Sequence, residues 1–251
     1  MAEIKALLFD VDGTLADTEK DGHRVAFNQA FQEADLDWHW TVDIYGDLLS
    51  VTGGKERIRY YLEKYQVPAP EVDDLAGFIA DLHKAKTAHY TRLLGEGSIP
   101  LRPGVERLLN EARENGVRLA IATTTTPANV TALLENTLGK ASIDWFEVIA
   151  AGDIVPAKKP APDIYLWAME KMEVTPDEVV AFEDSENGVR SVVDAGISRL
   201  LVTINDYTRE HNFDGASLVL NELGEPDRPA KVISGKGPAK GYVTLDDVFN
   251  L

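Results

Sequence analysis

Short apolar runs alternate with amphipathic helical segments along most of the 251-residue chain, and this alternation limits the possible folds more than any other feature. Runs of this length between polar turns are typical of strands buried on both faces of a sheet. They cover residues 4–9, 117–122, 148–151, 179–182 and 200–204, with a shorter sixth run at 218–220. Because strands that alternate with helices form parallel βαβ units, the sequence predicts an α/β fold with a mostly parallel sheet.

The helical segments between these runs carry apolar residues at helical spacing and end at glycines. One apolar stripe lies in residues 105–112 and is followed by Gly116, and another lies in 189–193 and is followed by Gly196. Glycine is the usual residue just after a helix because it adopts the left-handed conformation without strain. Residues 175–178 read Thr-Pro-Asp-Glu, which predicts a further helix start with a cap, an early proline and acids in the first turn.

Residues 16–97 interrupt the alternation. No convincing strand lies in this stretch, whereas apolar residues recur at helical spacing around 27–34, 58–65 and 79–94. The sequence therefore predicts a group of helices inserted directly after the first strand.

This pattern gives a two-domain organisation, with an α/β core at 1–15 and 98–251 and a helical cap domain at 16–97. Gly95 to Ser98 is the expected hinge on the return side of the insertion. The last 26 residues, from Pro226, are rich in Gly, Pro and Lys. We expect them to form a surface extension with a short final helix.

Charge and composition restrict the partners. The chain has 25 Lys and Arg against 42 Asp and Glu, a formal net charge of −17, which repels nucleic acids and anionic membrane surfaces. It has no cysteine, which excludes thiolate catalysis, cysteine zinc sites and disulfides. No apolar run approaches the ~18 residues of a membrane span. We therefore expect a cytoplasmic, monomeric protein that binds neither nucleic acid nor membrane.

Two carboxylates follow the first predicted strand. Asp10 and Asp12 lie two residues apart at its carboxyl end and enter a turn at Gly13. Ligands of open α/β sheets bind outside this end of the strands, so both carboxylates could face a ligand. The alternative interpretation is an ordinary loop, because Asp and Gly are common turn residues.

Other strand ends favour the ligand-binding interpretation. A lysine follows the third run at Lys159, stiffened by Pro160, and acids follow the fourth at Glu183 and Asp184. The second run leads into four consecutive threonines, Thr123, Thr124, Thr125 and Thr126. Hydroxyl, amide and ammonium groups bind phosphate oxygens, and clustered carboxylates suit Mg²⁺. Together, the four ends predict a phosphate and magnesium site.

In this order and spacing, the motifs resemble those of the haloacid dehalogenase superfamily over nearly the whole chain except the last ~25 residues. The resemblance implies a Rossmann-like, doubly wound parallel sheet with an inserted helical cap. It also implies that Asp10 is the nucleophile that accepts a phosphoryl group and that Asp12 is the general acid and base. Thr123 and Lys159 would bind the transferring phosphoryl oxygens.

The same resemblance implies the cofactor Mg²⁺. Asp10, the backbone carbonyl of Asp12 and Asp184 would hold the ion, and Glu183 would orient a water bound to it.

The insertion is similar to the cap of the β-phosphoglucomutase-like branch, and within it to Calvin-cycle sugar-bisphosphate phosphatases that hydrolyse xylulose-1,5-bisphosphate. This similarity implies substrate contacts from cap residues and from the four threonines. The cap residues are Glu19, His23, Gly53, Gly54 and Lys55. Two other interpretations are open: Lys55 is a solvated lysine at a helix start, and His23 is a structural hydrogen-bonding residue.

Other functions on the same scaffold make different demands on these residues. A dehalogenase of this fold lacks the second carboxylate, which is present here as Asp12. A sugar phosphate mutase would use the same residues but return the phosphoryl group to the substrate, so it stays open. A catalytically silent binding protein on this scaffold is the non-enzyme alternative, although the chain retains every acid of the motifs.

Overall fold

A seven-stranded sheet forms the centre of the computed structural model, which describes residues 3–97 and 99–251. The strand order is β3-β2-β1-β4-β5-β6-β7, with β7 the one antiparallel strand among the described residues. The strands are β1 (Ala6–Phe9), β2 (Arg118–Thr123), β3 (Phe146–Ala151), β4 (Val179–Glu183), β5 (Leu200–Thr203), β6 (Leu218–Leu220) and β7 (Val232–Gly235). The predicted α/β fold is confirmed, including the sixth strand.

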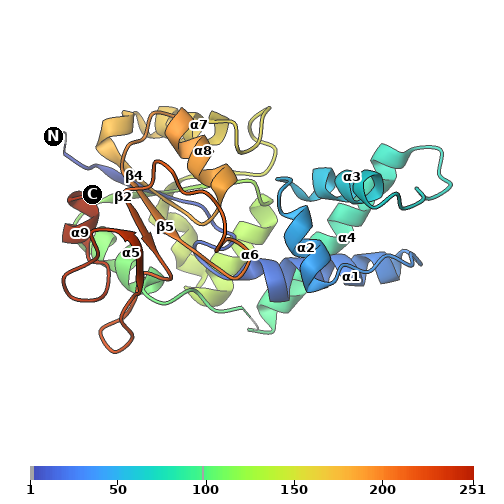
Figure 1. Cartoon of the computed structure of the whole chain (residues 1–251), viewed down its shortest axis with the longest axis horizontal. Coiled ribbons are helices and arrows are strands. Elements are labelled where there is room, and N and C mark those ends of the chain that lie inside the picture. The colour runs from blue at the N-terminus through green and yellow to red at the C-terminus, as the bar shows by residue number, and fades with distance from the viewer. Residues whose placement is uncertain (1–2, 98) are drawn as a thin grey trace.

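Helices cover both faces of this sheet (Figure 1). On one face, α5 (Val105–Glu114) and α6 (Pro127–Thr137) pack with Leu7 and Phe9 of β1. On the other face, α7 (Asp163–Met172) and α8 (Glu186–Asp194) pack with Ala6 and Leu8. Because successive side chains of β1 point to opposite faces, its continuous apolar run packs against the helices on both faces of the sheet. This arrangement is the doubly wound sheet that the resemblance implied.

The register of the central strands brings their carboxyl ends together. Phe9 of β1 pairs with Phe182 of β4, and the two rings stack with centroids 4.3 Å apart. Phe9 also lies opposite Ile121 of β2. The residues that follow Phe9 and Phe182 therefore leave the sheet at the same edge.

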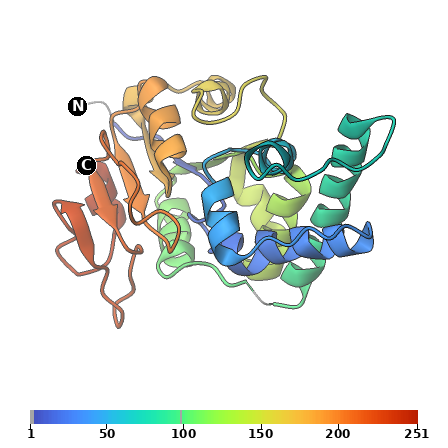
Figure 2. The ribbon, with the colours of Figure 1, turned by 45° about the vertical axis from the view of Figure 1, so that its right-hand side comes forward.

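The insertion forms a separate group of helices beside the sheet, at the end away from the two termini (Figures 1 and 2). It begins with a π-helical turn, η1 (Glu19–His23), and continues with α1 (Arg24–Glu33), α2 (Val42–Leu48), α3 (Gly54–Lys64) and α4 (Leu75–Gly95). These helices have their own apolar cluster, in which Phe27, Phe31 and Trp40 are buried. The three predicted helices are present as α1, α3 and α4. The sequence pattern missed α2 because it has seven residues, too few for a clear apolar stripe.

The chain enters and leaves the insertion through neighbouring segments, and the division into two domains at 15–16 and 97–98 stays a prediction. Ala16 is bridged to Leu101, so the outgoing and returning segments run side by side. Of the predicted hinge, Gly97 adopts a left-handed φ of 72°, and Ser98 lies outside the described residues.

Two local predictions were wrong in part. Residues 175–178 do form a capped turn, but the helix η3 (Pro176–Glu178) is a single 3₁₀ turn because β4 begins at Val179. The C-terminal segment is not only a surface extension. It contributes β7 and the helix α9 (Leu245–Phe249), and Val248 is buried in the core. The sequence analysis missed β7 because all four of its residues are exposed and give no apolar run.

Among the described residues, no helix combines the length and apolar character needed to cross a membrane.

The central strand predicts a stability effect. Leu8 is fully buried between β2 and β4, so Leu8→Ala should lower the free energy of unfolding by about 2–5 kcal/mol. The matched control is Leu166→Ala on α7, whose side chain is 47% exposed and whose loss should cost within about 0.5 kcal/mol. Urea denaturation of the two variants makes the comparison, and equal losses would contradict the assignment of Leu8 to the core.

Candidate active site

Four strand ends meet at one cavity of about 80 Å³. Asp10 follows β1, Thr123 ends β2, Glu183 ends β4, and Lys159 lies in the loop after β3. The sheet order places β1 between β2 and β4, which explains why residues far apart in the sequence converge here. The predicted residues that line this cavity are Asp10, Asp12, Glu19, Thr123, Thr124, Lys159, Glu183 and Asp184.

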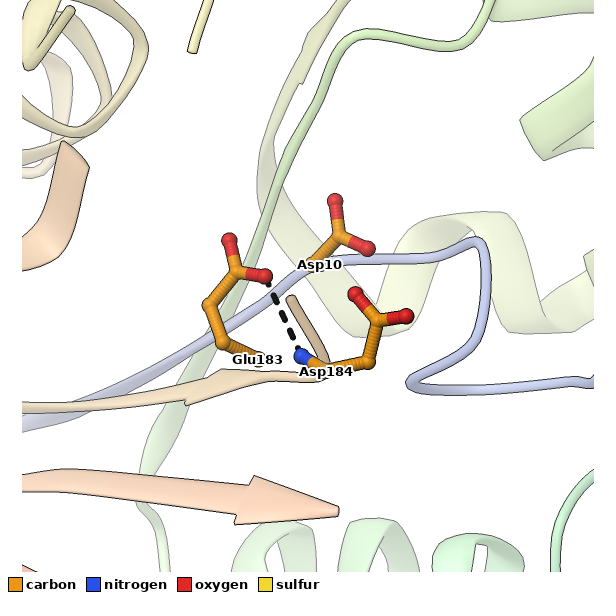
Figure 3. Close-up of side chains that lie close together, drawn as sticks. All are labelled: Asp10, Glu183 and Asp184. Carbon is orange, nitrogen blue, oxygen red and sulfur yellow. Dashed lines mark hydrogen bonds between the residues drawn. The ribbon is translucent and has the colours of Figure 1, made fainter. Parts of the chain in front are cut away.

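Asp10, Glu183 and Asp184 form a compact carboxylate cluster (Figure 3). One oxygen from each lies within 4.8 Å of the others, and all three residues are buried. Burial raises the pKa of Asp10 to about 7, and burial together with the charges of Asp10 and Glu183 raises the pKa of Asp184 well above its usual range. Clustered carboxylate oxygens are what Mg²⁺ prefers, so the donor set fits that ion. The Asp12 side chain is not part of the cluster.

The turn after β1 brings backbone close to this cluster. Gly13 has a left-handed φ of 84°, and a Cβ atom there would lie 2.2 Å from Asp184 Oδ2. Only glycine permits both the conformation and the close approach. Asn205, which the sequence analysis missed, donates from Nδ2 to the same Asp184 oxygen at 2.7 Å.

Lys159 places a positive charge beside the carboxylate cluster. Its Nζ donates to Asp10 Oδ1 at 2.7 Å and to Glu183 Oε1 at 2.6 Å, and the residue is 6% exposed. Burial alone would lower the pKa of this lysine, but the two carboxylates raise it above its usual value. The ammonium therefore stays charged between the two acids.

Asp12 turns away from the carboxylate cluster toward the insertion. Its Oδ1 accepts a hydrogen bond from Thr18 Oγ1 at 2.5 Å and lies 2.8 Å from His23 Nε2. Burial acts to raise the pKa of Asp12, but its contacts with His23 and Thr18 outweigh burial and hold the pKa well below its usual range. The insertion thus orients one of the two motif carboxylates.

Lys86 of α4 contacts the other ring nitrogen of His23. The Lys86 Nζ atom lies 2.7 Å from His23 Nδ1. An ammonium can only donate, so Nδ1 accepts and the Nε2 hydrogen points at Asp12. Both ring nitrogens are thereby engaged, and the ring stacks on Tyr90 at 4.0 Å. Burial lowers the pKa of Lys86 to about 8. The structural interpretation of His23 accounts for these contacts, and its contact with substrate stays a prediction.

A second cavity, of about 40 Å³, lies between the insertion and the threonine loop. It shares Asp12, Glu19, Arg57 and Thr124 with the first cavity. The other predicted residues on its wall are His23, Gly53, Gly54, Thr125 and Thr126. The two cavities therefore adjoin, one beside the carboxylate cluster and the other beside the helices of the insertion.

Glu19 and Arg57 lie where the two cavities adjoin, with Arg57 buried and Glu19 half-buried. Tyr45 donates its hydroxyl to Glu19, and Arg57 Nη1 donates to the Tyr45 hydroxyl at 2.7 Å. Arg57 also lies 3.7 Å from the Glu19 carboxylate. The sequence analysis predicted Glu19 but missed Arg57.

Lys55 does not line either cavity. Its Nζ pairs with Asp153 of the core at 2.6 Å. The neighbouring Glu56 pairs with Lys158 at 3.1 Å, and Lys158 also contacts Asp153 at 3.0 Å. Ion pairs among these four side chains connect the start of α3 with the loop that precedes Lys159. The predicted role of Lys55 in substrate binding stays a prediction.

The residues that sequence reasoning missed share a property. They support predicted side chains through tertiary contacts, and all except Thr18, which lies six residues from Asp12, are at least twelve residues from their partners. They are Thr18, Tyr45, Arg57, Lys86, Tyr165 and Asn205.

Comparison with known proteins supports the interpretation of the motifs. The model of the haloacid dehalogenase-like hydrolases matches residues 4–196. The chain is 48% identical over 221 residues to protein CbbY of Rhodobacter capsulatus, an alignment that covers 88% of this chain and 94% of the relative.

Two solved structures of CbbY from Rhodobacter sphaeroides are also similar. The structure in complex with phosphate is 47% identical and has a TM-score of 0.82, covering 88% of this chain and 96% of CbbY. The D10N mutant in complex with xylulose-(1,5)bisphosphate is 45% identical, with the same TM-score and coverage.

The contact of Lys86 with His23 predicts a spectroscopic signature. In the native protein the ¹⁵N shifts should report His23 as the tautomer protonated at Nε2, because Lys86 donates to Nδ1. Lys86→Met should remove this constraint and shift the tautomer equilibrium about tenfold toward Nδ1 protonation. The control is Lys84→Met, an exposed lysine on the same helix, which should leave the His23 resonances unchanged. A native-like His23 spectrum in Lys86→Met would refute the constraint.

Proposed function

The chain belongs to the haloacid dehalogenase-like hydrolases and is an enzyme of the phosphatase type, and we propose that it hydrolyses a small sugar bisphosphate with the help of Mg²⁺. The proposed substrate is xylulose-1,5-bisphosphate. The observation that carries this proposal is the 45% identity, over 88% of the chain, to a CbbY structure that holds this compound. A place in the Calvin cycle and a cytoplasmic location are part of the same proposal.

Asp10 is the proposed nucleophile. Lys159 occupies its Oδ1, and no hydrogen bond within residues 3–97 and 99–251 engages its Oδ2. That oxygen attacks phosphorus, the bond from phosphorus to the sugar oxygen breaks, and an aspartyl-phosphate forms. Splitting the hydrolysis in this way replaces one difficult step with two easier ones.

Asp12 is the proposed acid and base. Thr18 and His23 hold its Oδ1, and Asp12 lines both cavities, so its Oδ2 is available to the substrate. The pKa of Asp12 is low in the free protein, but the negative charge of a bound substrate phosphate raises it, so Asp12 takes up a proton as the substrate binds and gives it to the departing sugar oxygen in the first step. In the second step it takes a proton from the water that attacks the phosphorus of the aspartyl-phosphate, which releases phosphate and restores Asp10.

Asp10, Asp184 and the backbone carbonyl of Asp12 would hold the Mg²⁺, and Glu183, the third carboxylate of the cluster, would orient a water bound to it. When bound, the ion supplies positive charge that offsets the repulsion between the Asp10 carboxylate and the phosphoryl oxygens. Lys159 and the Thr123 hydroxyl would bind the same phosphoryl oxygens, since both line the cavity beside Asp10.

A bisphosphate also needs a cation for its second phosphate. Arg57 is 7% exposed and lines both cavities, whereas Lys55 is paired with Asp153 outside them. A guanidinium presents a fork of donors that matches phosphate geometry. We therefore propose that Arg57 binds the second phosphate, and that Lys55 does so only after leaving Asp153.

The substrate proposal is tested by phosphate release with Mg²⁺ from xylulose-1,5-bisphosphate, ribulose-1,5-bisphosphate and β-glucose-1-phosphate. We expect kcat/KM for xylulose-1,5-bisphosphate to exceed the others at least ~100-fold, about 2.7 kcal/mol of discrimination. EDTA and Asp10→Asn should each abolish release. A flat profile would contradict the assigned substrate, and isomerisation of β-glucose-1-phosphate without phosphate release would identify a mutase.

The two candidate cations for the second phosphate predict different kinetics. Arg57→Met should raise KM for the bisphosphate about tenfold, ~1.4 kcal/mol, with little change for p-nitrophenyl phosphate, which has one phosphate. Lys55→Ala should raise it less, because Asp153 holds that ammonium outside the cavities. Initial-rate kinetics on both substrates decide between them, and a larger effect at Lys55 would assign the second phosphate to that lysine.

A further inference from the structure

Glu183 is the most deeply buried carboxylate of the cluster, with an exposure of 1%. Its Oε1 accepts two hydrogen bonds, from Lys159 Nζ and from the Tyr165 hydroxyl, each at 2.6 Å. Its Oε2 accepts from the backbone N–H of Asp184 at 3.2 Å. A buried carboxylate needs such donors to remain ionised, and each one restricts where its oxygens lie.

Tyr165 contacts both charged partners of this group. It lies on α7 and is fully buried. While its hydroxyl donates to Glu183, the face of its ring lies 5.1 Å from Lys159 Nζ, a cation–π distance. Burial and the charge of Glu183 raise the pKa of the hydroxyl well above its usual value, so the group stays a donor at physiological pH.

The backbone of α8 closes the other side of Glu183. A Cβ atom on Gly188 would lie 1.9 Å from Glu183 Oε2, so this side chain rests directly on the helix. Glu183 is therefore confined between α8 on one side and Tyr165 with Lys159 on the other. Of these three contacts, the Tyr165 hydroxyl is the one that can be removed without changing charge or backbone.

We propose that Tyr165 is a positioning residue that holds Glu183 in place for the metal and keeps Lys159 shared between Glu183 and Asp10. Without the hydroxyl, Oε1 retains Lys159 as its one donor within the described residues. The ammonium then moves toward Glu183 and away from Asp10, and the Glu183 carboxylate gains freedom to rotate. This inference rests on the proposed phosphatase chemistry, but it does not depend on which sugar phosphate is the substrate.

The test is Tyr165→Phe, which keeps the ring and removes the hydroxyl. We expect the Kd for Mg²⁺, measured by calorimetry without substrate, to rise about tenfold. Loss of a hydrogen-bond partner of a metal ligand weakens metal binding on this scale. The kcat for p-nitrophenyl phosphate should fall about tenfold while KM stays within about twofold, because Tyr165 does not line the cavity.

The matched control is Tyr65→Phe. Tyr65 also donates its hydroxyl to a carboxylate, Asp47 at 2.8 Å, but it lies in the insertion and lines neither cavity. This variant should leave Mg²⁺ binding and kcat unchanged. Circular dichroism and thermal unfolding establish that both variants remain folded.

A double-mutant cycle with Glu183→Gln tests the route of the effect. If Tyr165 acts through Glu183, adding Tyr165→Phe to Glu183→Gln should change the Kd for Mg²⁺ by less than about twofold. Native Mg²⁺ binding and native kcat in the single variant would overturn the proposal, and so would full additivity in the cycle. Because calorimetry uses Mg²⁺ alone, a failed substrate assignment leaves this test intact.

Discussion

The structure depends on how three buried carboxylates are kept together beside a single buried ammonium. Asp10, Glu183 and Asp184 lie within a few ångströms of one another, and Lys159 bonds to the first two. Burying one carboxylate without a partner is costly, and burying three side by side adds their mutual repulsion. Lys159 offsets part of this cost, yet the pKa values of Asp10 and Asp184 stay raised, chiefly by burial and further by the neighbouring carboxylates. A site built this way favours a divalent cation and a substrate that brings its anion next to Lys159.

The sheet and the insertion supply different residues of the site. Strand ends supply the cluster and Lys159, and their positions follow from the register of β1 against its neighbours. The insertion supplies Thr18, His23 and Lys86, which orient Asp12, so the second carboxylate is fixed from outside the sheet. Because this chain of contacts joins the two parts of the protein, movement of the insertion would also change the orientation of Asp12. Ion pairs between α3 and the loop before Lys159 join the two parts at a second place.

Much of the fold was predictable because burial leaves a clear mark on the sequence. The central strands read as continuous apolar runs since helices cover both faces, and the motif residues stand at their ends. Elements without buried apolar residues leave no such pattern, so the sequence did not predict them in full. The exposed strand β7 carries no apolar run, and the residues at 175–178 mark a helix start, which is present, but do not specify its length of one turn. In the site, most of the missed side chains have partners far away along the chain, such as Lys86, which lies 63 residues from His23.

The sequence by itself determined the class of fold, the order of the strands along the chain and the residue types at each strand end. Those properties follow from local patterns, namely apolar runs, glycine turns and carboxylates or hydroxyls directly after a strand. The tertiary structure alone decided which cation faces which anion. Lys55 and Arg57 are two residues apart on one helix, yet one pairs with Asp153 on the outside and the other lies buried beside Glu19. Helical geometry turns residues two positions apart to different sides, and only the packing of the insertion against the core determines which side faces the cavity.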